Sequence, residues 1–327
     1  MTVDGQVVAA AMEAVRDGCR ATADLQSALG PEDRRLKGDD SPVTVADYVA
    51  QVVVMHRLCT ALGEQPMMAE EDADLLRRPE AHTLRQRIMA AAAPFVPSLT
   101  EEGLLDILDR GKSENQDAYW VLDPIDGTRG FLHGAQFCVA LARIEAGEPV
   151  VGLLGCPNLT VRSTPGVLFV ATHDGPATLS SLSGDRGPFR LASRRKERVP
   201  ISVRLTSSAA ASHCDPALGP RILRAADLPQ GPKIGLDSQV KYGLVAAGEA
   251  DGYVRLPRNQ SYVEKIWDHA AGTLIATRAG CQVTDFSGRP LRFDVGRHMI
   301  ANRGLVVAPP ALADRLLESI AGLGLAA

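Results

Sequence analysis

Two aspartates in one short stretch have the types and the spacing to bind a cation. The apolar run at residues 119–122, rich in strand formers, leads directly into Asp123 and Asp126. Because Pro124 cannot donate to a sheet ladder and Gly127 tolerates torsions that other residues avoid, we expect the strand to end at Asp123 in a turn. Both carboxylates then point into one small volume, where they repel each other unless a cation lies between them.

The backbone after this turn offers donors for a phosphate. The amides of Gly127, Thr128 and Arg129 open the next segment, where free backbone amides can bind an anion. The spacing alone is also compatible with a solvated turn that caps a helix. The longer string from Asp123 to Thr128, Asp-Pro-Ile-Asp-Gly-Thr, resembles the signature of the inositol monophosphatase superfamily, the metal-dependent and lithium-sensitive phosphomonoesterases.

A further carboxylate, Asp47, is expected at the start of a helix. An apolar stripe follows it at helical spacing, so one interpretation is a structural helix cap. The string from Ser41 to Asp47, Ser-Pro-Val-Thr-Val-Ala-Asp, is similar to the family segment whose last acid works with the threonine of the Asp-Gly-Thr turn. The resemblance implies that Asp47 and Thr128 together polarise an attacking water.

Three consecutive acids, Glu70, Glu71 and Asp72, follow a short apolar run at residues 67–69. Such a cluster is often a solvated surface. The superfamily places a metal-binding glutamate here, the first of a Glu-Glu pair, so the resemblance assigns Glu70 to the metal site and to the catalytic residues. The family usually has Gly before the pair and Ser after it, where this chain has Ala69 and Asp72. Whether Asp72 binds metal or faces solvent is left open.

The second family signature, Trp-Asp-x-Ala-Ala-Gly, is matched from Trp267 to Gly272. Asp268 stands where a helix is expected to begin, so a helix cap is again the alternative. In the family this aspartate completes a cluster that binds two or three Mg²⁺ ions. One ion lowers the pKa of the attacking water, and another neutralises the charge on the leaving oxygen. The implied ligands are hard oxygen donors: Glu70, the bridging Asp123, the carbonyl of Ile125, Asp126 and Asp268.

Three strings in the second half of the chain, at residues 237–244, 250–257 and 261–267, resemble the 3′(2′),5′-bisphosphate nucleotidases of fungi and plants. As structural alternatives, Lys241 would be a helix-surface lysine and Arg255 a strand-end arginine with its charge in water. In the resembling enzymes the matching residues hold the nucleotide and its 5′-phosphate. The implied substrate-binding residues are Gly127, Thr128, His213, Ser238, Lys241, Arg255 and Asp268.

The implied reaction is Mg²⁺-dependent, lithium-sensitive hydrolysis of adenosine 3′,5′-bisphosphate to AMP and phosphate, with the sulfated analogue and inositol polyphosphates as further substrates. An inositol monophosphatase or inositol polyphosphate 1-phosphatase is the alternative enzyme. A catalytically silent ligand sensor is the alternative from another class. The sensor would require a gap in the metal or water-activating set, and the sequence has none: Asp47, Glu70, Asp123, Asp126, Thr128 and Asp268 are all present.

The elements that must position these residues follow from hydrophobic periodicity. Val8, Ala11, Val15, Cys19 and Ala23 predict an amphipathic first helix, and residues 137–144 with 149–155 predict a hairpin. Residues 75–112 are expected to be helical, with breaks at Pro94 and Pro97. After residue 200, strands at 201–205, 233–236 and 252–256 alternate with helices, which favours an α/β layer.

The resemblance implies an αβαβα sandwich of two lobes. Residues 1–198 would carry the metal-binding and water-activating residues, and residues 199–327 the last metal ligand and the nucleotide-binding residues. The charged run at 194–198 is expected to be an exposed connection near the boundary.

Composition excludes several classes of protein. The chain has 327 residues, 45% of them hydrophobic, a formal net charge of −4 and a pI near 6.0, so no electrostatic footprint for a nucleic-acid polymer or a membrane surface is present. Six cysteines without a Cys-x-x-Cys pair argue against structural zinc and a disulfide scaffold. With no leader pattern or long apolar run, we expect a soluble, cytoplasmic enzyme acting on a small nucleotide. The oligomeric state is left open.

Overall fold

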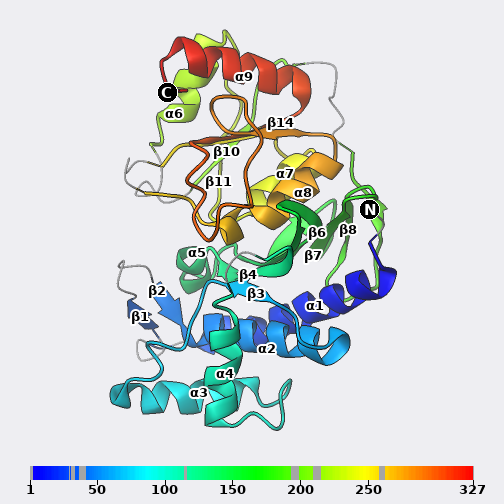
Figure 1. The fold of residues 1–327 in the computed structure, drawn as a ribbon. Coiled ribbons are helices and arrows are strands. Elements are labelled where there is room, and N and C mark those ends of the chain that lie inside the picture. The colour runs from blue at the N-terminus through cyan, green and yellow to red at the C-terminus, as the bar shows by residue number, and fades with distance from the viewer. Residues whose placement is uncertain are drawn as a thin grey trace.

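Five alternating layers of helices and sheets form the fold in the computed structural model, which describes residues 3–28, 30, 34–36, 42–113, 116–192, 199–208, 215–257 and 262–326 (Figure 1). The outer helices α1 (Gly5–Ala28) and α2 (Val45–Leu62) cover a seven-stranded sheet. Helices α7 (Val240–Ala247) and α8 (Ala270–Arg278) lie between that sheet and a five-stranded sheet, whose far face carries α6 (Leu218–Ala225) and α9 (Pro310–Gly322). The expected α/β sandwich is confirmed.

Helix α1 uses the predicted apolar stripe only in part. Ala11, Val15 and Cys19 are buried, whereas Ala23 is exposed, so the predicted stripe is buried only as far as Cys19 although the helix continues to Ala28. The burial of α2 is broader, because α1 and the first sheet pack on one side while α3 (His82–Ala92) and α4 (Glu101–Arg110) pack on the other. Within the described chain, α2 alone is long and apolar enough to span a membrane, and its 67% burial is that of a core helix.

The seven-stranded sheet brings two acidic segments to one edge. Its order is β3-β4-β5-β6-β7-β8-β9, with β3 (Met67–Ala69) parallel to β4 (Ala118–Asp126) and all other pairs antiparallel. Because β3 and β4 end at the same side, Glu70 emerges beside Asp123. The remaining strands are β5 (Cys138–Glu145), β6 (Glu148–Val161), β7 (Thr164–Thr172), β8 (Thr178–Ser181) and β9 (Phe189–Arg190). The predicted hairpin is β5 with β6.

Strand β4 does not end where its acids begin, which corrects the expected turn at Asp123. The strand continues to Asp126, with Asp123 opposite Ala140 and Asp126 opposite Cys138. β4 thus has one more residue than β5 between these two pairs, a bulge at the position where Pro124 can donate no ladder hydrogen bond.

The five-stranded sheet has the order β11-β10-β12-β14-β13, parallel across its first three strands and antiparallel beyond them. The expected strand at 201–205 is wrong in position: Ile201 is 94% exposed, and although Val203 is buried, the strand spans only Leu205–Ser207. The strands are β10 (Leu205–Ser207), β11 (Ile234–Gly235), β12 (Gly252–Arg255), β13 (Gln282–Thr284) and β14 (Leu305–Ala308).

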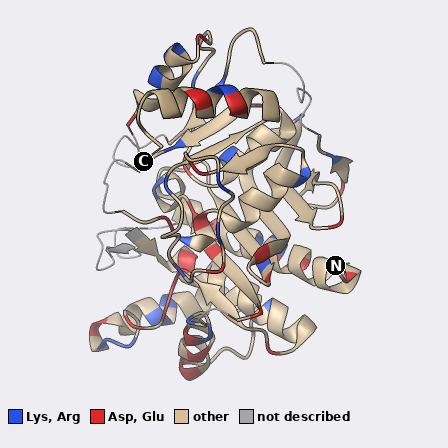
Figure 2. Cartoon of the chain, turned by 45° about the horizontal axis from the view of Figure 1, so that its top comes forward, with Lys and Arg blue, Asp and Glu red and all other residues tan. Residues whose placement is uncertain are grey.

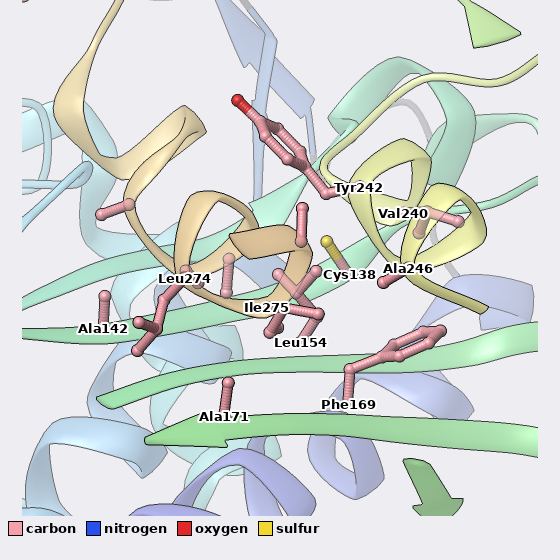
Figure 3. Close-up of a cluster of buried hydrophobic side chains, with 14 of the residues drawn as sticks. Cys138, Ala142, Leu154, Phe169, Ala171, Val240, Tyr242, Ala246, Leu274 and Ile275 are labelled. Atoms are coloured by element: carbon pink, nitrogen blue, oxygen red, sulfur yellow. The ribbon is translucent and has the colours of Figure 1, made fainter. Parts of the chain in front are cut away.

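The central core joins the two sheets through α7 and α8. In Figure 3, Leu154 and Phe169 from the first sheet lie against Val240 on α7 and Ile275 on α8. The two helices approach so closely that a Cβ on Gly272 would lie 2.5 Å from the Tyr242 ring. This close contact explains why the last position of the Trp-Asp-x-Ala-Ala-Gly string is a glycine.

Short elements complete the described chain. They are β1 (Arg34–Leu36), β2 (Pro42–Thr44), the 3₁₀ turns η2 (Pro79–Ala81) and η3 (Ile266–Asp268), and α5 (Thr128–Leu132). The helical prediction for 75–112 is confirmed by η2, α3 and α4. The charged run at 194–198 lies outside the described residues, so the lobe boundary there stays a prediction. Cys19, Cys59, Cys138, Cys156 and Cys281 are free thiols.

Candidate active site

Three carboxylates from two distant parts of the chain converge between the sheets. One oxygen each of Asp123, Asp126 and Asp268 lies within 4.8 Å of the other two. Figure 2 shows acidic positions gathered near the middle of the molecule. Asp123 is 2% exposed, and its Oδ1 is buried without a hydrogen bond from the described residues. A buried carboxylate oxygen without a donor requires another partner, and a cation is one that fits.

Electrostatics in this cluster favour a bound cation. Burial, and then the nearby charges of Glu70, Asp126 and Asp268, hold the pKa of Asp123 well above its usual range. Burial also raises the pKa of Asp126, against the opposing effect of Lys241, and that of Asp268. A divalent cation would offset this repulsion, and a donor set made only of oxygen suits Mg²⁺ better than zinc.

The direction of these pKa shifts predicts how Mg²⁺ stabilisation depends on pH. Because the folded-state pKa of Asp123 is raised, the metal-free protein loses stability as pH rises from the usual carboxyl range through that pKa. Mg²⁺ must displace the protons, so it should stabilise the protein more at high pH. We expect the Mg²⁺-induced rise in melting temperature to be larger at about pH 8 than at about pH 5.5, by at least about 2 °C. Thermal unfolding at matched ionic strength measures it, and an equal rise at both pH values would contradict it.

Glu70 lies beside the cluster, directly after β3. Its amide donates to the carbonyl of Leu122 at 3.1 Å, and its charge raises the pKa values of Asp123, Asp126 and Asp268. Asp72 instead accepts a hydrogen bond from the amide of Asp74 at 2.8 Å. The structure therefore brings Glu70 to the site and places Asp72 in a local turn.

Asp47 combines the two roles that the sequence offered as alternatives. It is fully buried at the third position of α2, where Oδ2 accepts from the Thr44 amide at 2.8 Å and from its hydroxyl at 2.7 Å. This is a capping box. The other oxygen, Oδ1, lies 3.4 Å from the hydroxyl of Thr128, which is also 3.2 Å from the Ile125 carbonyl. The cap thus holds Asp47 with one oxygen directed toward Thr128.

Gly127 supplies the turn that presents Thr128. Its φ of +95° lies in the left-handed region, and a Cβ there would lie 3.1 Å from the Cβ of Ser238. The start of α5 therefore lies against the segment that carries Ser238. That segment begins α7, and Ser238 is 8% exposed.

Lys241 is buried, so the helix-surface alternative is wrong, and Arg255 does stand at the end of β12 but its charge is paired with Glu264 and only partly exposed to water. Lys241 is 2% exposed, because α7 lies between the two sheets, and its Nζ donates to the carbonyls of Ser238 at 2.6 Å and Leu236 at 3.1 Å. Burial lowers the pKa of Lys241 to about 8. Arg255 forms a two-point ion pair with Glu264, with Nε and Nη2 at 2.7 and 3.0 Å from its oxygens.

A second group of possible ligands adjoins the first. Glu264, Asp268 and His269 also bring one atom each within 4.8 Å of one another. Glu264 is already paired with Arg255, and the Nδ1 of His269 lies 2.7 Å from the Tyr242 hydroxyl. We therefore assign no metal to this group.

Gln239 is a residue of the site that the sequence reasoning missed. Its amide N–H donates to Oδ2 of Asp126 at 2.6 Å. Its side chain donates to the Trp267 carbonyl at 2.7 Å and accepts from the Gly272 amide at 3.0 Å. It thereby joins the segments that carry two of the clustered carboxylates. The only signal for Gln239 in the sequence was its place inside the string that begins at Asp237.

His213, which the resemblance assigned to substrate binding, lies outside the described residues.

Comparison with known proteins matches this geometry to a family. The model of the inositol monophosphatase family matches residues 1–324. The chain belongs to this family. The prediction drawn from the Asp-Pro-Ile-Asp-Gly-Thr string is confirmed.

Curated relatives in the inositol monophosphatase family resemble this chain over most of its length. A 3′(2′),5′-bisphosphate nucleotidase of Oryza sativa is 35% identical, covering 96% of this chain and 93% of the relative. One of Emericella nidulans is 36% identical, covering 87% and 89%. The resemblance to fungal and plant nucleotidases is confirmed.

Solved structures share the fold. An IMPase from Thermotoga maritima has a TM-score of 0.65 at 20% identity, covering 95% of each chain. CysQ from Bacteroides thetaiotaomicron has a TM-score of 0.55 at 21% identity, covering 92% of this chain and 96% of the other. At these identities the likeness shows the fold alone.

Proposed function

We propose that this member of the inositol monophosphatase family is a Mg²⁺-dependent, lithium-sensitive 3′(2′),5′-bisphosphate nucleotidase that converts adenosine 3′(2′),5′-bisphosphate to AMP and phosphate. The observation that carries the hydrolytic chemistry is the cluster of Asp123, Asp126 and Asp268 within 4.8 Å, with a buried oxygen of Asp123 to which no described residue donates a hydrogen bond. The names of the curated relatives support the substrate.

The residues present fit a magnesium site. Two or three Mg²⁺ ions would be held by Glu70, Asp123, the Ile125 carbonyl, Asp126 and Asp268. Bound Mg²⁺ would supply a Lewis acid for the phosphoryl oxygens and lower the pKa of the attacking water.

Asp47 and Thr128 would activate that water. The Thr128 hydroxyl orients the water while its own hydrogen is directed to Asp47, which accepts the proton through Thr128 as the water oxygen attacks phosphorus. The bond from phosphorus to the ribose oxygen breaks on the opposite side, and that oxygen takes a proton from solvent. The amides of Gly127 and Thr128 can bind the phosphoryl oxygens as their charge grows.

Substrate choice would depend on the second phosphate. We propose that Ser238, Lys241 and Arg255, with His213, bind the nucleotide and its 5′-phosphate, because a buried lysine and a mostly enclosed arginine can form strong charge-assisted hydrogen bonds with phosphate. The pKa of Lys241, about 8, keeps its ammonium charged at neutral pH. We also propose a cytoplasmic location, which the free state of the described cysteines supports.

A Lys241→Met variant tests this assignment. We expect it to lower kcat/KM for adenosine 3′,5′-bisphosphate by about 10- to 100-fold, the range of a lost hydrogen bond to a charged group, but to change turnover of adenosine 3′-monophosphate little. Steady-state kinetics with both substrates measures the difference. Lys241 suits the test better than Arg255, whose removal would take away the two-point ion pair of Glu264 and leave that carboxylate only His269 as a charged partner.

Three results would count against the proposal. Equal losses on both substrates would mean that Lys241 only organises the loop whose carbonyls it binds. A wild-type preference for inositol 1-phosphate over adenosine 3′,5′-bisphosphate would favour an inositol monophosphatase instead. An absence of any Mg²⁺-dependent phosphate release would favour a ligand sensor.

A further inference from the structure

Arg297 joins the two parts of the chain that carry the clustered carboxylates. It lies in the loop between β13 and β14, 228 positions from Ala69, yet its Nη2 donates to the Ala69 carbonyl at 2.8 Å. Its Nη1 lies 3.4 Å from the Gly111 carbonyl. The guanidinium also lies over the Trp267 ring, 4.6 Å from its centroid.

On the first-sheet side, Arg297 fixes the peptide group that leads into Glu70. The oxygen of that peptide accepts from Arg297, and its N–H, which belongs to Glu70, donates to Leu122 of β4 at 3.1 Å. Both ends of the peptide are therefore bound. A rotation of this peptide would redirect Glu70 relative to Asp123.

On the other side, Arg297 fixes the residue before Asp268. Its own carbonyl accepts from the Ile266 amide at 3.0 Å, and its guanidinium packs on the Trp267 ring. The Trp267 carbonyl is in turn held by Gln239. The segment that carries Asp268 is thus held by Gln239, the N-cap of α7, and by Arg297 from the β13–β14 loop.

We propose that Arg297 is a positioning residue that sets the distance between Glu70 and Asp268 and thereby the affinity of the site for Mg²⁺. The inference rests on one part of the proposed function, the magnesium site that includes Glu70 and Asp268. A guanidinium can do this because its planar fork can donate to two carbonyls while one face packs on an aromatic ring, which a lysine ammonium cannot reproduce.

The test is Mg²⁺ binding, measured by titration calorimetry with Mg²⁺ alone and no substrate. We expect Arg297→Met and Arg297→Lys to raise the Kd for Mg²⁺ by about 10- to 100-fold, the usual effect of losing a residue that orients metal ligands. Saturating Mg²⁺ should restore most of kcat. Arg292→Met is the matched control, because Arg292 lies in the same loop in an exposed ion pair with Asp294, and its Kd should stay within about threefold of wild type.

The outcomes separate the two proposals. Arg297 variants that fold and keep the wild-type Kd for Mg²⁺ overturn the positioning role, even if their melting temperature falls. Loss of kcat that saturating Mg²⁺ does not restore overturns it as well. If Arg297→Met fails to fold, Arg297→Lys carries the test. Wild-type protein that binds Mg²⁺ but hydrolyses no phosphate ester would refute the proposed function and leave this inference standing, whereas wild-type protein that binds no Mg²⁺ would refute both.

Discussion

Asp123→Asn is expected to abolish Mg²⁺-dependent phosphate release and to leave a metal-free protein that is folded and more heat-stable than wild type. The loss follows because Asp123 is the most enclosed of the clustered carboxylates and has a buried oxygen that receives no hydrogen bond within the described part of the chain. A catalytic metal supplies several kcal/mol of transition-state stabilisation, so we expect kcat/KM to fall at least about a thousandfold.

The gain in stability has a separate cause. In wild type, burial and the charges of Glu70, Asp126 and Asp268 raise the pKa of Asp123, so ionising this group destabilises the metal-free fold. The neutral amide removes that repulsion. Its stabilising effect should therefore grow as pH rises from the usual carboxyl range through the raised pKa of Asp123.

Phosphate release with and without Mg²⁺, together with thermal unfolding in a chelator, measures both effects. Asp109→Asn is the control, because Asp109 forms surface ion pairs with Arg77 and Lys112 and should leave activity unchanged. An Asp123→Asn enzyme with full Mg²⁺-dependent turnover would remove Asp123 from the residues proposed to hold Mg²⁺. A variant that loses activity because it unfolds would remove the account of stability.

The carboxylates of the site were predictable because each lies in a short sequence string whose neighbouring residues are also required by the local backbone or packing. In Asp-Pro-Ile-Asp-Gly-Thr, the proline and glycine shape the backbone that presents the acids. In Trp-Asp-x-Ala-Ala-Gly, Gly272 is required by the contact with Tyr242. Because these requirements are local, a short string of this kind can be interpreted from one sequence alone.

Arg297 and Gln239 were not predictable for the opposite reason. Their side chains bind main-chain carbonyls and amides, which every residue type offers, so no sequence pattern marks the partners. The burial of Lys241 could not be predicted from the sequence either. A lysine in an apolar helix is consistent with an exposed position, and only the stacking of two sheets around α7 encloses it.

Asp47→Asn is the other substitution for which we expect a large loss, about 10²- to 10⁴-fold in kcat, the usual range for proton transfer by a positioned side chain. We expect the accompanying loss of folding stability to be small. An asparagine carbonyl can still accept from the Thr44 amide, so only part of the capping box is lost, at about 1 kcal/mol. The side-chain NH2 group of the asparagine would then face the Thr128 hydroxyl, and this group cannot accept a proton.

Because a weakened helix start could itself lower activity, the comparison must be with another lost cap. Thr100→Ala removes the N-cap hydrogen bond of α4, where the Thr100 hydroxyl accepts from the Gly103 amide at 3.0 Å, far in sequence from every proposed site residue. Its stability loss should be similar, with kcat unchanged. Thr128→Val should lower kcat as Asp47→Asn does, and the double variant should lose little more, since both act on one proton. Additive losses in that cycle would mean that Asp47 and Thr128 act separately, and equal activity of Asp47→Asn and Thr100→Ala would reduce Asp47 to a helix cap.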